Sequence, residues 1–174
     1  MSDLSGEYVI YGGELSYFSR KLEAALNFYG VQFEMRPKTP DNRNEIESRS
    51  GTHQVPVLHT PENWMIGDTT PLIELLDARF PSRRLIPPGP LGLLVHMLEE
   101  YFDEWVAWTM VHWRWHYEHS AEFASLRMAN GNPEQAKIVR EWGPRACRAT
   151  GTESPQQQQA AEAEYERLLA AMES

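Results

Sequence analysis

The fold of this chain is decided by residues 55–76, which read VPVLHTPENWMIGDTTPLIELL. The opening Val-Pro-Val-Leu is strand-like, but a proline cannot donate to a sheet ladder, so we expect Pro56 at the first position of a strand, after a bond that can be cis. A Thr-Pro-Glu-Asn turn leads to a second short strand at 64–66. The apolar residues that follow recur at helical spacing, which predicts a helix capped by Thr69 or Thr70.

The start of this helix is a candidate anion-binding site. A threonine hydroxyl and the unpaired backbone N–H groups of a first helical turn attract negative charge. The backbone N–H and C=O of Val55, beside Pro56, are expected to face this helix end. The combination suits a peptide-like ligand that carries a carboxylate.

Composition narrows the class of protein. With 174 residues, of which 41% are hydrophobic and 24% charged, the chain can bury a core as one domain or two small ones. Its net charge of −9 offers no basic face for nucleic acid or an anionic membrane, and its apolar runs are too short to span a membrane. The single cysteine, Cys147, excludes an intramolecular disulfide and a CxxC redox or zinc site, so we expect a cytoplasmic protein.

The residues before the opening segment predict a strand, a helix and a second strand. Residues 7–11 alternate as a strand, and a 3.6-residue apolar pattern then predicts a helix capped by Ser16 or Ser19. Residues 31–35 alternate again, and a right-handed crossover would make the two strands parallel. A short, weak helix within 37–49 completes the order β-α-β-α-β-β-α, which is a small α/β domain.

A linker separates this domain from a helical one. Four prolines fall within residues 81–90, so we predict a first domain over 1–81, a linker over 82–90 and an all-helical domain over 91–174. The helices expected in the last domain span residues 91–120, 133–142 and 156–172, the second broken by Gly143-Pro144 and the third preceded by a capping box, Ser154-Pro155-Gln156-Gln157.

Three motifs at compatible spacing resemble the cytosolic glutathione transferases. Residues 11–21 (YGGELSYFSRK) resemble the strand end and Ser-Pro-Tyr-Ser-Arg-Lys opening of that family. Residues 53–58 (HQVPVL) are similar to its cis-proline motif, and residues 68–76 (DTTPLIELL) to the Glu/Asp-Ser segment that starts its third helix. The resemblance covers roughly the first half of the chain. It implies a thioredoxin-like N-terminal domain followed by an all-α, partial transferase-type C-terminal domain.

The resemblance also implies how the glutathione thiol is activated. Ser16 stands where the serine-type classes keep the hydroxyl that hydrogen-bonds the sulfur. A hydroxyl donor at a helix start stabilises thiolate over thiol and so lowers the pKa of the sulfur. Tyr11 is a rival donor, because other classes use a tyrosine from that strand. The alternative is that Ser16 has only a structural role, as a helix cap.

The remaining glutathione contacts follow from the same resemblance. The backbone of Val55, next to Pro56, would pair with the cysteinyl unit of the tripeptide. The γ-glutamyl end would be held by the Asp68 carboxylate and the Thr69 helix start. The glycine carboxylate would be contacted by His53, for which Gln54 is a substitute.

The implied reaction is transfer of glutathione, as co-substrate and without a metal, to a small hydrophobic electrophile. The electrophile pocket would be formed by Tyr17, Tyr101, Trp105 and Trp108. The family has proline where Tyr17 stands, and it adds several helices after the one near Pro155, so we expect the helical domain to be incomplete. A non-catalytic glutathione-binding or protein-interaction member is the alternative, and an assembly module is a weaker one. Family members are usually homodimers, which is the expectation here.

Three histidines form a further candidate site. His112, His116 and His119 share one face of the expected long helix, a spacing that can ligate a metal. No acid or cysteine in the sequence pattern completes the site. We therefore expect a packed or solvated row of histidines.

Overall fold

The structure is a computed structural model that describes residues 7–173. Residues 1–6 and 174, which open the first expected domain and close the last, lie outside the described residues. The chain forms two compact units, Met1–Glu99 and Glu100–Ser174.

A four-stranded sheet of order β2-β1-β3-β4 lies at the centre of the N-terminal unit. Its strands are β1 (Tyr8–Tyr11), β2 (Phe33–Arg36), β3 (Val57–His59) and β4 (Met65–Gly67). Strand β1 pairs in parallel with β2 and antiparallel with β3, and β3 pairs antiparallel with β4. The predicted parallel pairing of the first two strands is confirmed.

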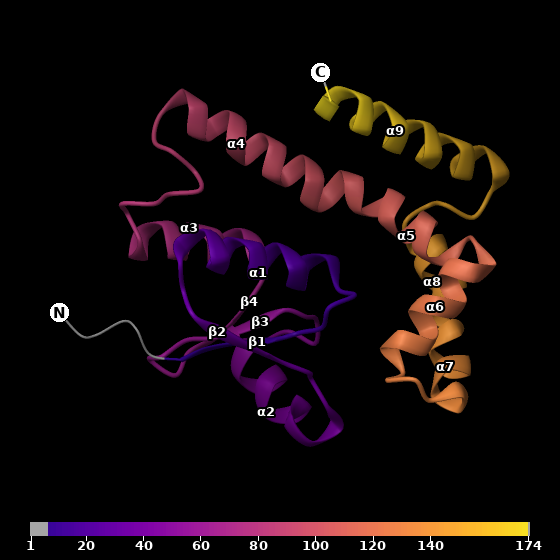
Figure 1. The fold of residues 1–174 in the computed structure, drawn as a ribbon, viewed down its shortest axis with the longest axis horizontal. Helices are drawn as coiled ribbons and strands as arrows, with labels where there is room; N and C mark the ends of the chain where they lie inside the picture. Colours follow the sequence, from indigo (N-terminus) through magenta and orange to yellow (C-terminus); the bar gives the residue numbers. More distant parts are fainter. Residues whose placement is uncertain (1–6, 174) are drawn as a thin grey trace. The chain divides into compact units, whose positions relative to one another are not determined.

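Helices cover both faces of this sheet (Figure 1). The covering helices are α1 (Tyr17–Tyr29), α2 (Pro40–Ser50) and α3 (Thr69–Arg79), and the proline-rich segment that follows α3 leads to α4 (Pro90–Glu100). In Figure 1, α1 and α3 lie on one face of the sheet and α2 on the other. The order β-α-β-α-β-β-α is the thioredoxin-like arrangement expected from the sequence.

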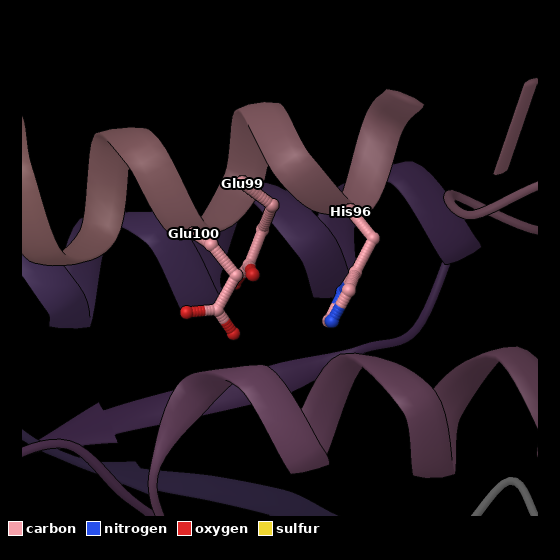
Figure 2. Close-up of side chains that lie close together, drawn as sticks. All are labelled: His96, Glu99 and Glu100. Atoms are coloured by element: carbon pink, nitrogen blue, oxygen red, sulfur yellow. The ribbon is translucent and has the colours of Figure 1, made fainter. Parts of the chain in front are cut away.

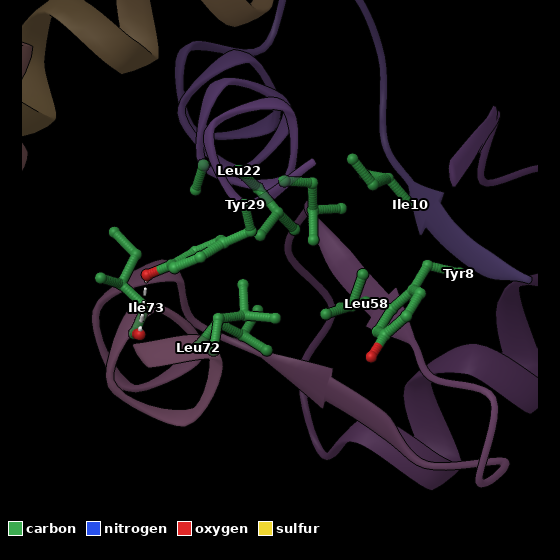
Figure 3. Packing of buried hydrophobic residues seen from close by; sticks show 10 residues of the cluster. Tyr8, Ile10, Leu22, Tyr29, Leu58, Leu72 and Ile73 are labelled. Atoms are coloured by element: carbon green, nitrogen blue, oxygen red, sulfur yellow. Dashed lines mark hydrogen bonds between the residues drawn. The ribbon is translucent and has the colours of Figure 1, made fainter. Parts of the chain in front are cut away.

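The main core lies between the sheet and the α1–α3 layer (Figure 3). Alternate strand residues point to this side, which places Tyr8 and Ile10 of β1 together with Leu58 of β3. They pack against Leu22 of α1 and Leu72 of α3, and all five are almost fully buried. A smaller cluster on the other face joins residues of β3, β4 and α2: Val57, Met65 and Ile46.

Strand β2 begins at Phe33, two residues later than expected. Gly30 ends α1 in the left-handed region with φ +74°, where glycine pays no steric cost. The Val31 N–H then donates to the Leu26 carbonyl at 3.0 Å. Val31 therefore closes the end of α1 instead of joining the sheet.

The cap of α3 differs from the prediction. Asp68, rather than Thr69 or Thr70, is the N-cap, and its Oδ1 accepts the Thr70 N–H at 3.2 Å. The helix starts one residue earlier than predicted because the carboxylate of Asp68, a favourable N-cap residue that lies at φ +68°, accepts a first-turn N–H.

The C-terminal unit is helical, but the single helix predicted over 91–120 is wrong. Helix α4 is followed by a π-helical turn (Tyr101–Val106) and then by α5 (Ala107–Trp115). A break at His116 and Tyr117 precedes α6 (Glu118–Met128). The continuous apolar and aromatic pattern concealed both interruptions.

The last three helices are α7 (Pro133–Arg140), α8 (Trp142–Ala149) and α9 (Pro155–Glu173). Gly143-Pro144 does not break a helix. It lies in the first turn of α8, where a missing N–H costs no hydrogen bond. The predicted capping box of α9 is confirmed, since the Ser154 N–H donates to Gln157 Oε1 at 3.0 Å and the Gln157 N–H to Ser154 Oγ at 3.3 Å. Within residues 7–173, no helix combines the length and the apolar character needed to cross a membrane.

Candidate functional site

Sheet register brings three separate parts of the sequence to one edge of the N-terminal unit. Tyr11, the last residue of β1, pairs with Val57, the first of β3, and Val57 pairs with Gly67, the last of β4. The segments that continue from this row are those that lead to Ser16, back to Val55, and on to Asp68. Residues more than fifty positions apart therefore meet at the same end of the sheet.

Ser16, one of the two residues predicted to cap this helix, is the N-cap of α1. Its Oγ accepts the Ser19 N–H at 3.2 Å. A serine hydroxyl has two acceptor positions and one donor, so the cap leaves the O–H able to donate. Capping and donation to a ligand are compatible roles for this side chain.

The other candidate cap, Ser19, is buried beneath the preceding loop. Its Oγ accepts the Gly13 N–H at 3.3 Å. A Cβ on Gly12 would lie 2.4 Å from the same oxygen, so only glycine permits this close approach. The contact fixes the loop that carries Ser16.

Tyr11 points to the other side of the sheet from α1. Its ring packs with the cluster of Ile46, Val57 and Met65 and stacks on His59 with 6.5 Å between ring centroids. Strand alternation explains this, because Ile10 faces α1 and its neighbour must face α2.

The bond before Pro56 is cis, as the sequence indicated. The side chains of His53 and Gln54 are exposed just before it. Their backbone carbonyls interact with the ammonium of Lys38, a residue that the sequence motifs did not single out. Only the folded loop reveals this contact, since no periodic pattern links position 38 to position 53.

Asp68 and Thr69 lie where the third helix begins. The Asp68 side chain is exposed and caps the helix, while Thr69 is 3% exposed. Backbone N–H groups of the first turn point out of the helix end beside this carboxylate. The site thus offers an acceptor for a cation next to donors for an anion.

The residues assigned to the electrophile pocket are divided between the two units. Tyr17 opens α1 and meets Phe18 edge-on at 5.3 Å between ring centroids. Tyr101, whose hydroxyl donates to Glu164, lies in the C-terminal unit, as do Trp105 and Trp108. This hydrogen bond raises the pKa of Tyr101, with burial as the second cause. Their joint role stays a prediction.

The three histidines form an aromatic cluster. His112 is fully buried, and its Nε2 lies 2.9 Å from Glu162 Oε1 on α9. His116 stacks on it with 4.8 Å between ring centroids, while His119 lies beyond the break, in α6.

One group of possible metal ligands gathers elsewhere within residues 7–173: His96, Glu99 and Glu100 of α4 (Figure 2). Glu99 Oε1 already accepts the Lys21 ammonium and, at 2.9 Å, the Thr70 hydroxyl. This carboxylate is therefore neutralised by a cation of the chain.

Similarity to known proteins agrees with this geometry. Residues 10–84 match the family model of the glutathione S-transferase N-terminal domain. A glutathione S-transferase from Rhodospirillum rubrum F11 is 25% identical over 57% of this chain and 46% of that chain, with a TM-score of 0.51. No curated protein matches the sequence.

Two further solved structures share the fold. Rice GST1, crystallised with glutathione, is 22% identical over 72% of this chain and 60% of that one, with a TM-score of 0.51. The β-etherase LigF from Sphingobium sp. strain SYK-6 is 18% identical over 94% of this chain and 71% of that one, with a TM-score of 0.64. The chain spans about half of the length of the Rhodospirillum protein and about three fifths of the rice protein. Over residues 10–84, the chain is thus similar to the N-terminal domain of the glutathione S-transferases.

Proposed function

We propose that this protein binds glutathione and transfers its thiolate to a small hydrophobic electrophile. The observation that carries the proposal is the row Tyr11–Val57–Gly67, which brings the start of α1, the cis-proline loop and the start of α3 to one sheet edge. The glutathione bound in the rice structure supports the choice of ligand.

In this proposal, the O–H of Ser16 donates to the sulfur while its Oγ keeps the cap of α1. The helix start adds positive potential, so the thiol releases its proton to water more readily. The resulting thiolate forms a C–S bond to the electrophilic carbon, whose bond to its leaving group breaks, and the leaving group departs with that electron pair. We favour Ser16 over Tyr11 because the Tyr11 ring packs with Ile46 on the α2 side of the sheet.

The peptide part of the ligand would be held by main-chain and end-group contacts. The N–H and C=O of Val55, before Pro56, would pair with the cysteinyl unit as an added strand. Asp68 would accept the γ-glutamyl ammonium, and the Thr69 helix start would bind the adjacent carboxylate. The glycine carboxylate would contact His53 or Gln54. Together with Val55 and Asp68, these residues would bind both ends of the tripeptide.

Replacing Ser16 tests this assignment. Ser16→Ala should raise the pKa of the thiol of bound glutathione, which is measured by the absorbance of the thiolate. It should also lower the rate of transfer to an aromatic electrophile roughly tenfold to a hundredfold. Ser154→Ala is the matched control, because it removes an equivalent cap from α9, outside the site. An unchanged rate in Ser16→Ala would refute its role and make Tyr11→Phe the next variant.

A non-catalytic glutathione-binding or protein-interaction role is the second candidate. It is favoured by Tyr17, which stands where the resembling family has a proline beside the serine. Calorimetry with glutathione and S-hexylglutathione separates the two candidates. Tighter binding of the hexyl conjugate supports a pocket formed by Tyr17, Tyr101, Trp105 and Trp108, whereas equal binding favours the non-catalytic role.

We also propose that the protein acts in the cytoplasm as a homodimer, with domains over 1–81 and 91–174. Five large apolar side chains of α4 are more than half exposed, which a second copy would cover: Leu91, Leu93, Leu94, Met97 and Leu98.

A further inference from the structure

We propose that Lys38 is a positioning residue for the ligand: it holds the two peptide groups before Val55 and so fixes the direction of the Val55 N–H. The inference rests on the proposed binding of glutathione.

Lys38 lies between β2 and α2, and its ammonium reaches across to the loop before Pro56. Nζ donates to the His53 carbonyl and lies 3.4 Å from the carbonyl oxygen of Gln54. It also forms an ion pair with Glu47 Oε1 of α2 at 3.0 Å. Although the loop itself is exposed, the Lys38 side chain is only 11% exposed. The ammonium group of Lys38 is therefore largely shielded from solvent and held by fixed partners.

Peptide planarity connects this contact to the ligand site. The Gln54 carbonyl and the Val55 N–H belong to one planar peptide group and point in opposite directions. A cation that holds the carbonyl on one side therefore sets the direction of the N–H on the other. The same ammonium holds the preceding peptide through His53, which limits rotation of the segment as a whole.

The remaining restraints on this loop are weaker. The Gln54 N–H donates to Thr52 Oγ1 at 3.1 Å, and the Thr52 N–H lies 3.4 Å from Ser50 Oγ. Both are bonds between neutral groups, which are roughly half as strong as bonds to an ammonium. Through its bond to the His53 carbonyl, Lys38 is thus the strongest described restraint on the segment that precedes Val55.

Lys38→Met tests the proposal, because methionine keeps an unbranched apolar stem but removes the charge. We expect glutathione affinity, measured by calorimetry, to fall about tenfold, since binding must then order the loop. Lys137→Met is the matched control: Lys137 pairs with Glu134 on the surface of α7. The Lys137→Met variant should bind glutathione with the same affinity as the wild type.

A ligand without glycine separates positioning from direct contact. If Lys38 acts through the Val55 peptide, Lys38→Met should weaken γ-glutamylcysteine and glutathione by the same factor. If only glutathione is weakened, Lys38 binds the glycine carboxylate and the positioning role is overturned. Wild-type protein that binds neither ligand would refute the proposed function itself, a result distinct from either outcome.

Hydrogen exchange gives a readout that needs no ligand. In Lys38→Met, the amides of residues 53–55 should exchange faster than in the wild type, while the strand amides of β1 stay unchanged. Unchanged exchange at 53–55 would overturn the proposal. Faster exchange throughout the N-terminal unit would also overturn it, since Lys38 would then support the fold in general.

Discussion

The Ser16 hydroxyl has three hydrogen-bonding positions, and the cap of α1 occupies one of them. The helical spacing predicted that a serine caps this helix but did not choose between Ser16 and Ser19. That choice depends on Gly12, whose missing side chain lets the loop close over Ser19. A contact between loop and helix leaves no periodic signal, so the sequence could narrow the site only to two residues.

Asp77 is a second residue whose role appears only in the folded chain. It is 7% exposed, and its two carboxylate oxygens accept the Tyr29 hydroxyl at 2.6 Å and the N–H groups of Leu85 and Ile86 at 2.7 and 2.9 Å. Burial, and then the hydrogen bond to Asp77, raise the pKa of Tyr29 well above its usual range. This carboxylate ties the proline-rich segment to α1 and α3.

Asp77→Asn should lower the free energy of unfolding by about 2 kcal/mol, since an amide N–H₂ would face a backbone N–H where an oxygen now accepts. Chemical denaturation measures the change. Asp41→Asn is the control, because Asp41 is exposed in the first turn of α2 and should lose only a few tenths of a kcal/mol. Equal effects of the two substitutions would contradict the role of Asp77.

Among the elements, the helix after the linker departs most from expectation. The π-helical turn at Tyr101–Val106 adds a residue to one turn and so rotates the faces that follow. Val106 is buried, whereas Trp105 is 56% exposed. An unbroken apolar pattern predicts a helix but not a change in its pitch, which explains why the sequence did not reveal the π-helical turn.

Helix α9 is held to the rest of the C-terminal unit by a narrow strip. Ala161 is its only described residue that is fully buried. Beside it, Glu162 Oε1 accepts the Tyr117 hydroxyl at 2.5 Å and faces His112 Nε2 at 2.9 Å. The hydrogen bond from Tyr117, and then that from His112, lower the pKa of Glu162.

A carboxyl group with a lowered pKa in the fold stabilises the fold when ionised. Its contribution is present above the pKa of the unfolded chain, about 4.3, and is lost as the pH falls through the lower pKa of the folded state. Glu162→Gln should therefore lower the midpoint temperature of unfolding at neutral pH. As the pH is lowered, this midpoint should fall less steeply in the variant than in the wild type.

Hydrogen exchange should locate this effect in α9, with faster exchange in Glu162→Gln. Glu166→Gln provides the comparison, because Glu166 is exposed on the same helix. A variant at position 162 that matches the one at 166 in midpoint and exchange would show that the strip does not hold the helix.

At the scale of the molecule, the strand and helix order of the N-terminal unit was predictable because alternation and helical periodicity are strong in its short elements. The ends of β1, β3 and β4 are each marked by glycine or proline, so it followed from topology that the segments leading to Ser16, Val55 and Asp68 leave the same edge of the sheet. The Lys38 contact did not, because it joins a side chain to backbone atoms of a distant loop.

The exposed apolar side chains of α4 bear on assembly. They lie on a chain with a net charge of −9, so two copies repel one another unless salt screens the charge. If a second copy covers α4, the association should strengthen as salt is added, which is the opposite of an interface held by ion pairs. Sedimentation velocity over a concentration series at low and high salt measures this directly.

Leu94→Glu should shift the protein towards monomer, because it places a charge in the apolar contact and adds to the repulsion. Ile138→Glu adds the same charge at an exposed aliphatic residue of α7 and should leave the association unchanged. Equal weakening by both variants would mean that net charge alone governs association. A wild-type protein that stays monomeric at high salt would remove the homodimer from the proposed function and leave α4 to another partner.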